Sequence, residues 1–495
     1  MGLRQFPPEL VTALSSFWEY SEARGVFLTG EGNLKYLQEV VLDHNNIQIL
    51  PAVISQMPCL ESLNASANLI QTLPASVGNL ISLKSLDLSK NGLVAIHEEI
   101  SNLVNLEQLK LHENEITEVP ECISALQSLK EFSLSQNNLV QLPNSLPQLT
   151  GLKNLLVAKN NLSEIPDLIF KIQTLTKLIL VENHITKVPK ELGLLTNLTD
   201  LVLTYNKLKT LPKEIGELWK LDYLVLDENM ITELPDSIEH LTSLKELSFN
   251  DNRITRFPLS LGALTQLEIL ELSLSENRIS RMHPALFKLT QLTILNLNSN
   301  RLQKIPESIR NLEQLVTFSC GSNFIEDIPP EICELDNLRQ LVLFGNNIRH
   351  VCPELGGLTG LEVLSLSQNQ LTDIPKQMLK TLTNLKELWL AFNHLHSIPS
   401  SIGYLKHLEQ LWLQDNELES LPPQIGSLKN LNVLTLTGNR ISELPDSLKR
   451  LEISQYHEGH VDKNKKNVHV SGEEGAEYWQ DLELDRFVQE SYPLS

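Results

Sequence analysis

Two histidines near the C-terminal end of the sequence have the residue type and spacing of metal ligands. His457 and His460 stand three residues apart, a separation that could bring both imidazoles to one ion. No third ligand at a comparable spacing accompanies them, and a zinc site takes three or four protein ligands. We therefore expect no metal site.

The sequence motifs of common enzyme chemistries do not occur in the chain. It contains no G-x-x-x-x-G-K-[ST] phosphate loop, no G-x-G-x-x-G turn after a strand, no H-E-x-x-H and no G-x-S-x-G. The five cysteines are scattered and form no C-x-x-C pair. The sequence thus predicts a non-catalytic protein with no cofactor and no small-molecule substrate.

The charge balance limits the classes of partner. The chain has 61 acidic and 40 basic residues, a formal net charge of −21, so its surface as a whole repels nucleic acid and anionic lipid. No apolar run reaches the ~20 residues that span a bilayer, and the first residues do not read as a secretion signal. Scattered cysteines suit a reducing compartment. We expect a cytoplasmic protein with protein partners, which reaches membranes only through those partners.

A period of 23 residues organises the chain from Leu37 to about Glu452. The unit reads L-x-x-L-x-L-x-x-N-x-I-x-x-L-P-x-x-I-x-x-L-x-x and recurs 18 times, as counted by its asparagine. These asparagines are Asn45, Asn68, Asn91, Asn114, Asn137, Asn160, Asn183, Asn206, Asn229, Asn252, Asn277, Asn300, Asn323, Asn346, Asn369, Asn393, Asn416 and Asn439.

Each part of the unit has a physical reason. The L-x-L alternation favours a short strand with its leucines on one side. An asparagine amide can satisfy the backbone groups of the following turn, which predicts a ladder of stacked asparagines rather than a catalytic row. The Leu-Pro step ends the extended segment, and I-x-x-L supplies one helical turn. One unit cannot bury its leucines alone, so the repeats are expected to stack into an α/β solenoid with a parallel sheet on its concave face.

With this unit the chain resembles the leucine-rich repeat proteins, in particular the intracellular 23-residue class with L-P-x-x-I-x-x-L. That class includes the Shoc-type Ras–Raf scaffolds, the Ras-suppressor protein, and the repeat domains of the Scribble and Erbin polarity scaffolds. The resemblance implies a horseshoe with short helical or 3-10 turns on its convex side. It also implies a scaffold or adaptor in Ras/MAPK signalling, with Ras-family small GTPases or kinase-pathway components as partners. A cell-polarity or cytoskeletal scaffold is the alternative.

Three regions follow from the pattern. Residues 1–36 are expected to form an N-terminal cap, with an amphipathic helix near 8–18 and an incomplete strand beginning at Gly25. Residues 37–453 form the repeat domain of about 18 repeats, and residues 454–495 form a partial cap and an acidic tail.

Two repeats depart from the 23-residue period. Asn252 and Asn277 are 25 residues apart, which places two extra residues within 267–276. They are interpreted either as a tolerated loop on the convex side or as a change of curvature that divides the concave face. Asn369 and Asn393 are 24 residues apart, with the extra residue expected near 378–380.

The variable positions of L-x-x-L-x-L-x-x-N face a partner on the concave side, and most are small or polar. Two stretches depart from this rule. The first places aliphatic residues beside Tyr205 and Tyr223, and the second contains Val342, Phe344, Trp389, Phe392 and Trp412. Trp389 and Trp412 occupy equivalent positions of neighbouring repeats, so their indoles should be lateral neighbours, ~4.8 Å apart by strand spacing. The aromatics are either a binding surface or a set of residues that only pack on one another.

Acidic residues lie between these two stretches, at Asp227, Asp251 and Glu271 among others. Like charges on one face cost stability unless they are screened or meet a basic partner. They are interpreted either as an ordinary solvated face or as a site for a partner that carries Lys or Arg.

Overall fold

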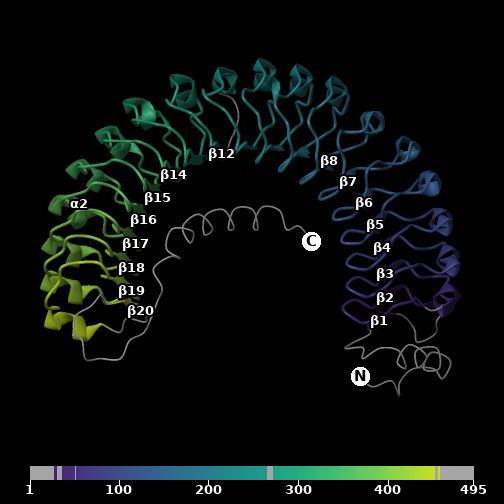
Figure 1. Ribbon diagram of the computed structural model, residues 1–495, viewed down its shortest axis with the longest axis horizontal. Coiled ribbons are helices and arrows are strands. Elements are labelled where there is room, and N and C mark those ends of the chain that lie inside the picture. Colours follow the sequence, from purple (N-terminus) through teal and green to yellow (C-terminus); the bar gives the residue numbers. More distant parts are fainter. Residues whose placement is uncertain (1–26, 30–35, 51, 265–270, 452–454, 458–495) are drawn as a thin grey trace.

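The computed structural model describes residues 27–29, 36–50, 52–264, 271–451 and 455–457. These residues wind into an open arc in which every repeat adds one turn of a coil (Figure 1). The helix expected near 8–18, most of the N-terminal cap and the acidic tail lie outside the described residues.

Twenty strands of three residues each form one sheet within the described part of the chain. β1 pairs with β2 antiparallel, and each later strand pairs in parallel with the next along the sequence. The strands are β1 (Phe27–Thr29), β2 (Glu39–Val41), β3 (Ser62–Asn64), β4 (Ser85–Asp87), β5 (Gln108–Lys110), β6 (Glu131–Ser133), β7 (Asn154–Leu156), β8 (Lys177–Ile179), β9 (Asp200–Val202), β10 (Tyr223–Val225), β11 (Glu246–Ser248), β12 (Glu271–Ser273), β13 (Ile294–Asn296), β14 (Thr317–Ser319), β15 (Gln340–Val342), β16 (Val363–Ser365), β17 (Glu387–Trp389), β18 (Gln410–Trp412), β19 (Val433–Thr435) and β20 (Gln455–His457).

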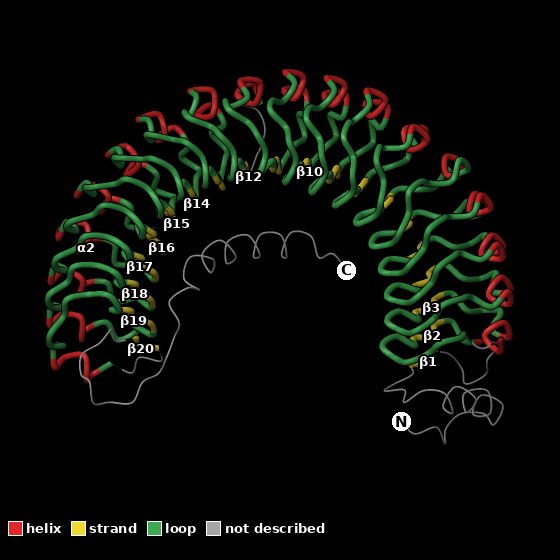
Figure 2. Tube along the Cα trace, in the orientation of Figure 1, coloured by secondary structure: helices red, strands yellow, loops and turns green. Residues whose placement is uncertain are grey.

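Short helices line the outer edge of the arc, opposite the strands on its inner edge (Figure 2). Nearly all are single 3-10 turns, as the I-x-x-L step predicts, and most follow a proline whose φ and ψ are extended, as at Pro235. The 3-10 helices are η3 (Ala52–Gln56), η4 (Ala75–Asn79), η5 (Glu98–Asn102), η6 (Glu121–Ala125), η7 (Leu146–Gln148), η8 (Asp167–Lys171), η9 (Lys190–Leu194), η10 (Lys213–Glu217), η11 (Asp236–His240), η12 (Leu259–Ala263), η13 (Pro284–Lys288), η14 (Glu307–Asn311), η15 (Pro330–Glu334), η16 (Pro353–Gly357), η17 (Ser400–Tyr404), η18 (Pro423–Ser427) and η19 (Asp446–Arg450).

The extra residue between Asn369 and Asn393 is found in the outer helix of that repeat. There the 3-10 turn is replaced by an α-helix, α2 (Lys376–Thr381), of six residues instead of five. This agrees with the expected place of the insertion near 378–380.

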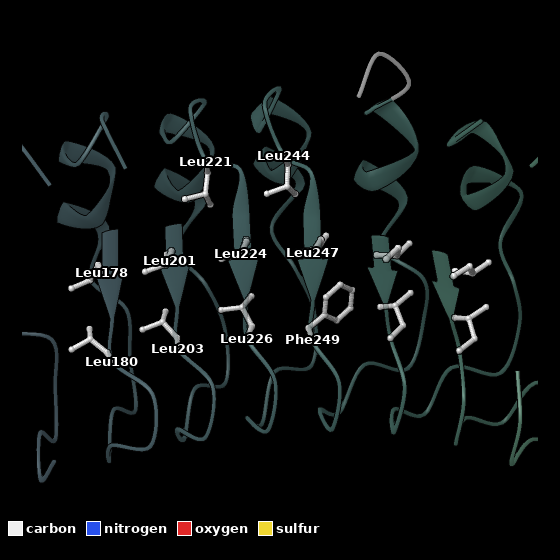
Figure 3. Packing of buried hydrophobic residues seen from close by; sticks show 14 of the residues in the cluster. Leu178, Leu180, Leu201, Leu203, Leu221, Leu224, Leu226, Leu244, Leu247 and Phe249 are labelled. Carbon is white, nitrogen blue, oxygen red and sulfur yellow. The ribbon is translucent and has the colours of Figure 1, made fainter. Parts of the chain in front are cut away.

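The core lies between the sheet and the helices and runs through the length of the solenoid. The central residue of most strands is a leucine, such as Leu201, Leu224 and Leu247, which points away from the concave side and stacks on its equivalents in the next repeats (Figure 3). Because each repeat covers only its neighbours, the stability of the fold is a sum of local interfaces.

The asparagine ladder is confirmed, and Asn229 illustrates it. Its Nδ2 donates to the carbonyl oxygens of Leu203, Leu226 and Asp227 at 2.9, 3.0 and 3.0 Å. Its Oδ1 accepts the backbone N–H of Leu208, in the preceding repeat, at 3.0 Å. The side chain is only 8% exposed, so it links two turns that water does not reach.

The sheet continues across the two-residue insertion. β12 pairs with β11 and β13 in the regular parallel register, with Leu247, Leu272 and Leu295 side by side. The extra residues therefore fall between η12 and β12, in a stretch of which residues 265–270 lie outside the described chain. Strand pairing is unbroken here, so the insertion does not interrupt the concave sheet.

Candidate functional site

Trp389 and Trp412 form a pair on the concave sheet. They are direct partners in the register of β17 and β18, and their ring centroids are 5.5 Å apart with an interplanar angle of 38°. The expected lateral contact between the indoles is thus confirmed. Both side chains remain half-buried, so part of each ring faces the interior of the arc.

Hydrogen bonds fix the two indoles in place. Trp389 Nε1 donates to Glu387 Oε2 and Trp412 Nε1 donates to Gln410 Oε1, both at 3.1 Å. In each case the acceptor lies two residues earlier, on the same face of the same strand. A partner would therefore meet rings that are already ordered, which reduces the entropy lost on binding.

Phe392 follows Trp389 by three residues and immediately precedes the ladder asparagine Asn393. Its φ is +54°, in the left-handed region, and its side chain is 41% exposed. Gly345 and Gly438 occupy the same position of other repeats, immediately before the ladder asparagine. The residue before every ladder asparagine has positive φ, so this conformation belongs to the repeat, and Phe392 is distinguished by its large exposed ring. We call Trp389, Phe392 and Trp412 the aromatic surface.

The other two residues of this stretch are less accessible than expected. Val342 is only 5% exposed, and it lies between Ser319 and Ser365 of the adjacent strands. Val342 therefore adds little accessible surface of its own to this stretch in the free chain. Phe344 is half-buried and lies against Gly321, where an added Cβ would come within 2.4 Å of its ring. Sequence reasoning missed Gly321, although a glycine among polar residues at that position was a visible signal.

A second apolar stretch lies on β7 to β10, away from the aromatic surface. Leu156, Ile179, Val202 and Val225 are lateral neighbours in the strand register and form a cluster separate from the main core. We call these four residues the aliphatic row. Ile179, Val202 and Val225 are more buried than the sequence suggested, and Leu156 is partly buried against them.

The two tyrosines expected beside this stretch are placed differently from each other. Tyr205 is 50% exposed, has a φ of +55°, and donates a hydrogen bond from its hydroxyl to Glu228. Tyr223 is half-buried in β10 between Asp200 and Glu246.

Asp227 is not the free surface charge that the sequence suggested. Its Oδ1 accepts hydrogen bonds from Ser248 Oγ and from the backbone N–H of Asn250, both at 2.7 Å. One repeat later, Asn250 Oδ1 accepts equivalent bonds from Ser273 Oγ and Ser275 N–H. The assignment of Asp227 to partner binding is therefore corrected to a role in joining adjacent repeats.

The remaining acidic residues stay together on the concave side. Asp251 is exposed, and Glu276 is half-buried at the equivalent position of the next repeat, both with positive φ. Glu271 lies in β12 beside Glu246 of β11, and its side chain is outside the described part of the structure. Burial, together with the charges of Asp251 and Glu276, raises the pKa of Glu228.

We predict that Asp227→Asn stabilises the protein at neutral pH. Burial raises the pKa of Asp227 to about 6, although its hydrogen bonds oppose the rise. A folded-state pKa above the ordinary value of about 3.8 means that stability falls as pH rises from about 4 to 6. Asn250 shows that an amide makes the same bonds, so the variant should be more stable by about 1–2 kcal/mol at pH 7.

Chemical unfolding of both proteins at pH 4 and pH 7 tests this prediction. The difference in free energy of unfolding between variant and wild type should be larger at pH 7. If the variant and the wild type differ by the same free energy of unfolding at both pH values, ionisation of Asp227 does not destabilise the folded protein.

The described residues contain no group of three His, Cys, Asp or Glu side chains arranged to hold a metal ion. His457 contributes to the backbone of β20, and His460 lies outside the described residues. No helix in the described ranges is long and apolar enough to cross a membrane.

Comparison with known proteins identifies the repeat. A family described as a leucine-rich repeat region matches residues 95–209, 178–287 and 282–398, and a second, described as leucine-rich repeats in two copies, matches residues 406–450. A search of curated proteins gave no significant match.

Several solved structures are similar. A leucine-rich repeat protein from Leptospira interrogans shares 29% identity over 85% of this chain and 96% of its own, with a TM-score of 0.53. The plant peptide hormone receptor RGFR1, in complex with RGF2, shares 27% identity over 81% of this chain and 78% of its own, with a TM-score of 0.59. The ectodomain of the receptor kinase GASSHO1/SCHENGEN3 from Arabidopsis thaliana, in complex with CASPARIAN STRIP INTEGRITY FACTOR 2, shares 28% identity over 83% of this chain and 56% of its own, with a TM-score of 0.53.

Proposed function

The chain belongs to the leucine-rich repeat family, and from this premise we propose that it is a non-catalytic scaffold or adaptor that holds protein partners on its concave face. Proteins with this fold generally act as protein-binding modules, and solved relatives include a receptor in complex with a peptide hormone. A fold alone does not assign a function, so the proposal depends on a specific surface.

The aromatic surface is the observation that carries the proposal. Three large aromatic side chains remain partly open to the concave side, and two of them are fixed by hydrogen bonds. Ordered, partly exposed tryptophans on neighbouring strands of a concave surface are typical of binding hot spots. If Trp389 and Trp412 served only to stabilise the sheet, burial of both rings would be the more favourable arrangement.

We further propose that the partners belong to intracellular signalling of the Ras/MAPK type, and that the protein acts in the cytoplasm. The 23-residue unit with L-P-x-x-I-x-x-L supports this assignment, because the Shoc-type and Ras-suppressor proteins share it. The partners would then be Ras-family small GTPases or components of their kinase pathway. A polarity or cytoskeletal scaffold is the competing assignment.

Direct binding to purified Ras-family GTPases tests the signalling assignment. The full chain is immobilised and exposed to a panel of these GTPases loaded with either GTP or GDP. We expect at least one of them to bind, with a preference for the GTP-loaded form. Equal or absent binding across the panel, with capture of junctional or cytoskeletal proteins from lysate, would contradict the Ras assignment and favour the polarity scaffold.

A further inference from the structure

A second surface, distinct from the aromatic surface, runs along the concave side of β7 to β12. It begins with the aliphatic row on β7 to β10, where Ile179, Val202 and Val225 are each at most 8% exposed and pack side by side. Their packing leaves only the tops of these side chains open, and Leu156 is the more accessible member of the row. At β11 and β12 the same strand position changes to Ser248 and Ser273.

Charges on the two halves of this surface differ in how they are compensated. Beside the aliphatic row, Lys159 pairs with Glu182 at 3.3 Å and Lys177 lies 4.0 Å from Asp200. Near Ser248 and Ser273, Glu246 precedes this strand position, and Asp251 and Glu276 follow it. No lysine or arginine among the described residues forms an ion pair with these three carboxylates.

The electrostatic consequence is a local excess of negative charge. Burial raises the pKa of Glu246, and burial with the charge of Asp251 raises the pKa of Glu276. Burial is the main cause of both shifts, and the absence of an ion pair to these carboxylates in the described residues is the separate, geometric sign of excess negative charge. A ligand that brings positive charge to this half would remove the repulsion.

The spacing of the repeats favours a helix as the ligand. Neighbouring strands lie ~4.8 Å apart, and one turn of an α-helix rises ~5.4 Å, so a helix laid along the surface accumulates a mismatch of ~0.6 Å at each repeat, about 3.6 Å over six repeats. Alternate residues of an extended chain are ~6.7 Å apart, which accumulates a mismatch of ~1.9 Å at each repeat. A helix therefore departs from the spacing of the repeats about three times more slowly than an extended chain does.

We propose that β7 to β12 bind an amphipathic helix of a partner protein, whose apolar side chains cover the aliphatic row and whose Lys or Arg side chains reach Glu246, Asp251 and Glu276. The helix needs apolar residues over about four turns and basic residues over about two more. This inference does not depend on the aromatic surface, which lies on β17 and β18. The chain would then hold two partners at once.

The probe is a labelled synthetic peptide of 21 residues, with leucines on one face of its first four helical turns and lysines in its last two. A control peptide has the same composition in an order that removes the helical periodicity. Binding to the full chain is measured by fluorescence anisotropy. We expect the ordered peptide to bind at least tenfold more tightly than the control, because general attraction to an acidic protein acts on both.

Matched variants locate the peptide. Asp251→Lys with Glu276→Lys should weaken binding at least tenfold, and lysine suits this backbone position because Lys90 and Lys159 occupy it elsewhere with positive φ. Val202→Ser should weaken binding several-fold, and serine suits that strand position, as Ser248 shows. Glu113→Lys with Asp415→Lys makes the same change in net charge at the same position of distant repeats, and should leave binding unchanged.

Two results would overturn the inference. One is equal affinity for the ordered and control peptides, which would indicate attraction by net charge alone. The other is an equal loss of affinity in the distant charge variant. The Trp389→Ala, Trp412→Ala double variant should bind the peptide normally. A negative result for the helix site can therefore be told apart from a negative result for partner binding at the aromatic surface.

Discussion

Replacing Asn229 with alanine is expected to lower the local free energy of unfolding by about 1–3 kcal/mol. The Leu208 amide would lose Asn229 Oδ1 as its acceptor, and the Leu203 carbonyl would lose one of its donors. Because Asn229 is buried, water does not readily reach the Leu208 N–H or the Leu203 carbonyl to replace the lost side-chain amide. Because each repeat contacts only its neighbours, the damage should stay close to the substituted repeat.

Amide hydrogen exchange measures this loss residue by residue. The Leu208 amide should exchange roughly 5 to 160 times faster in the variant, which corresponds to the same range of free energy. Amides several repeats away should keep their protection. Asn161→Ala is the matched control, because Asn161 is exposed and is not a ladder asparagine. Unchanged exchange at Leu208 would refute the ladder role.

Replacing Trp389 and Trp412 together with alanine is expected to weaken binding of the protein partner about 30-fold or more, a loss of at least ~2 kcal/mol. The free energy of unfolding should change by no more than about 1 kcal/mol, the value of a cross-strand pair. The physical reason is that both rings are only half-buried in the free protein and would become fully buried in the complex.

Trp219→Ala is the control for this double variant. Trp219 lies in the turn after η10, outside the sheet, and is 52% exposed. Titration calorimetry should show unchanged affinity for this control, and chemical unfolding should show all three proteins folded. A large loss of stability in the double variant would mean that the tryptophans are packing residues.

The repeating part of the fold could be predicted from the sequence because each consensus residue has one structural task. The leucine alternation requires a strand with one buried face, and the asparagine has the donors and acceptor that the turn lacks. The consensus residues of one repeat were therefore enough to predict the solenoid, the parallel sheet and the lateral contact between Trp389 and Trp412.

Side-chain accessibility could not be predicted in the same way, because it depends on the neighbouring repeats. Val342 occupies a concave strand position, yet only 5% of it is exposed in the stacked repeats. The sequence predicts that Asp227 is a surface charge, but in the structure Ser248 and Asn250 donate hydrogen bonds to its carboxylate. These partners are 21 and 23 residues away, so only the stacked structure brings them together.

The positive φ of Tyr205 and Phe392 could also not be predicted from the sequence. Both precede a ladder asparagine, and the residue before each of the 18 asparagines has positive φ. The rule is periodic, but the sequence does not reveal it, because only Gly345 and Gly438 are glycines.

The most direct test of the central claim, that partners bind the concave aromatic surface, is hydroxyl-radical footprinting of the full chain with and without its captured protein partner. Oxidation is quantified at each tryptophan, and Trp219 provides an internal reference away from the sheet. The account predicts that the partner protects Trp389, Trp412 and Phe392 and leaves Trp219 as reactive as in the free chain. Protection of Trp219 without protection of Trp389 and Trp412 would contradict it.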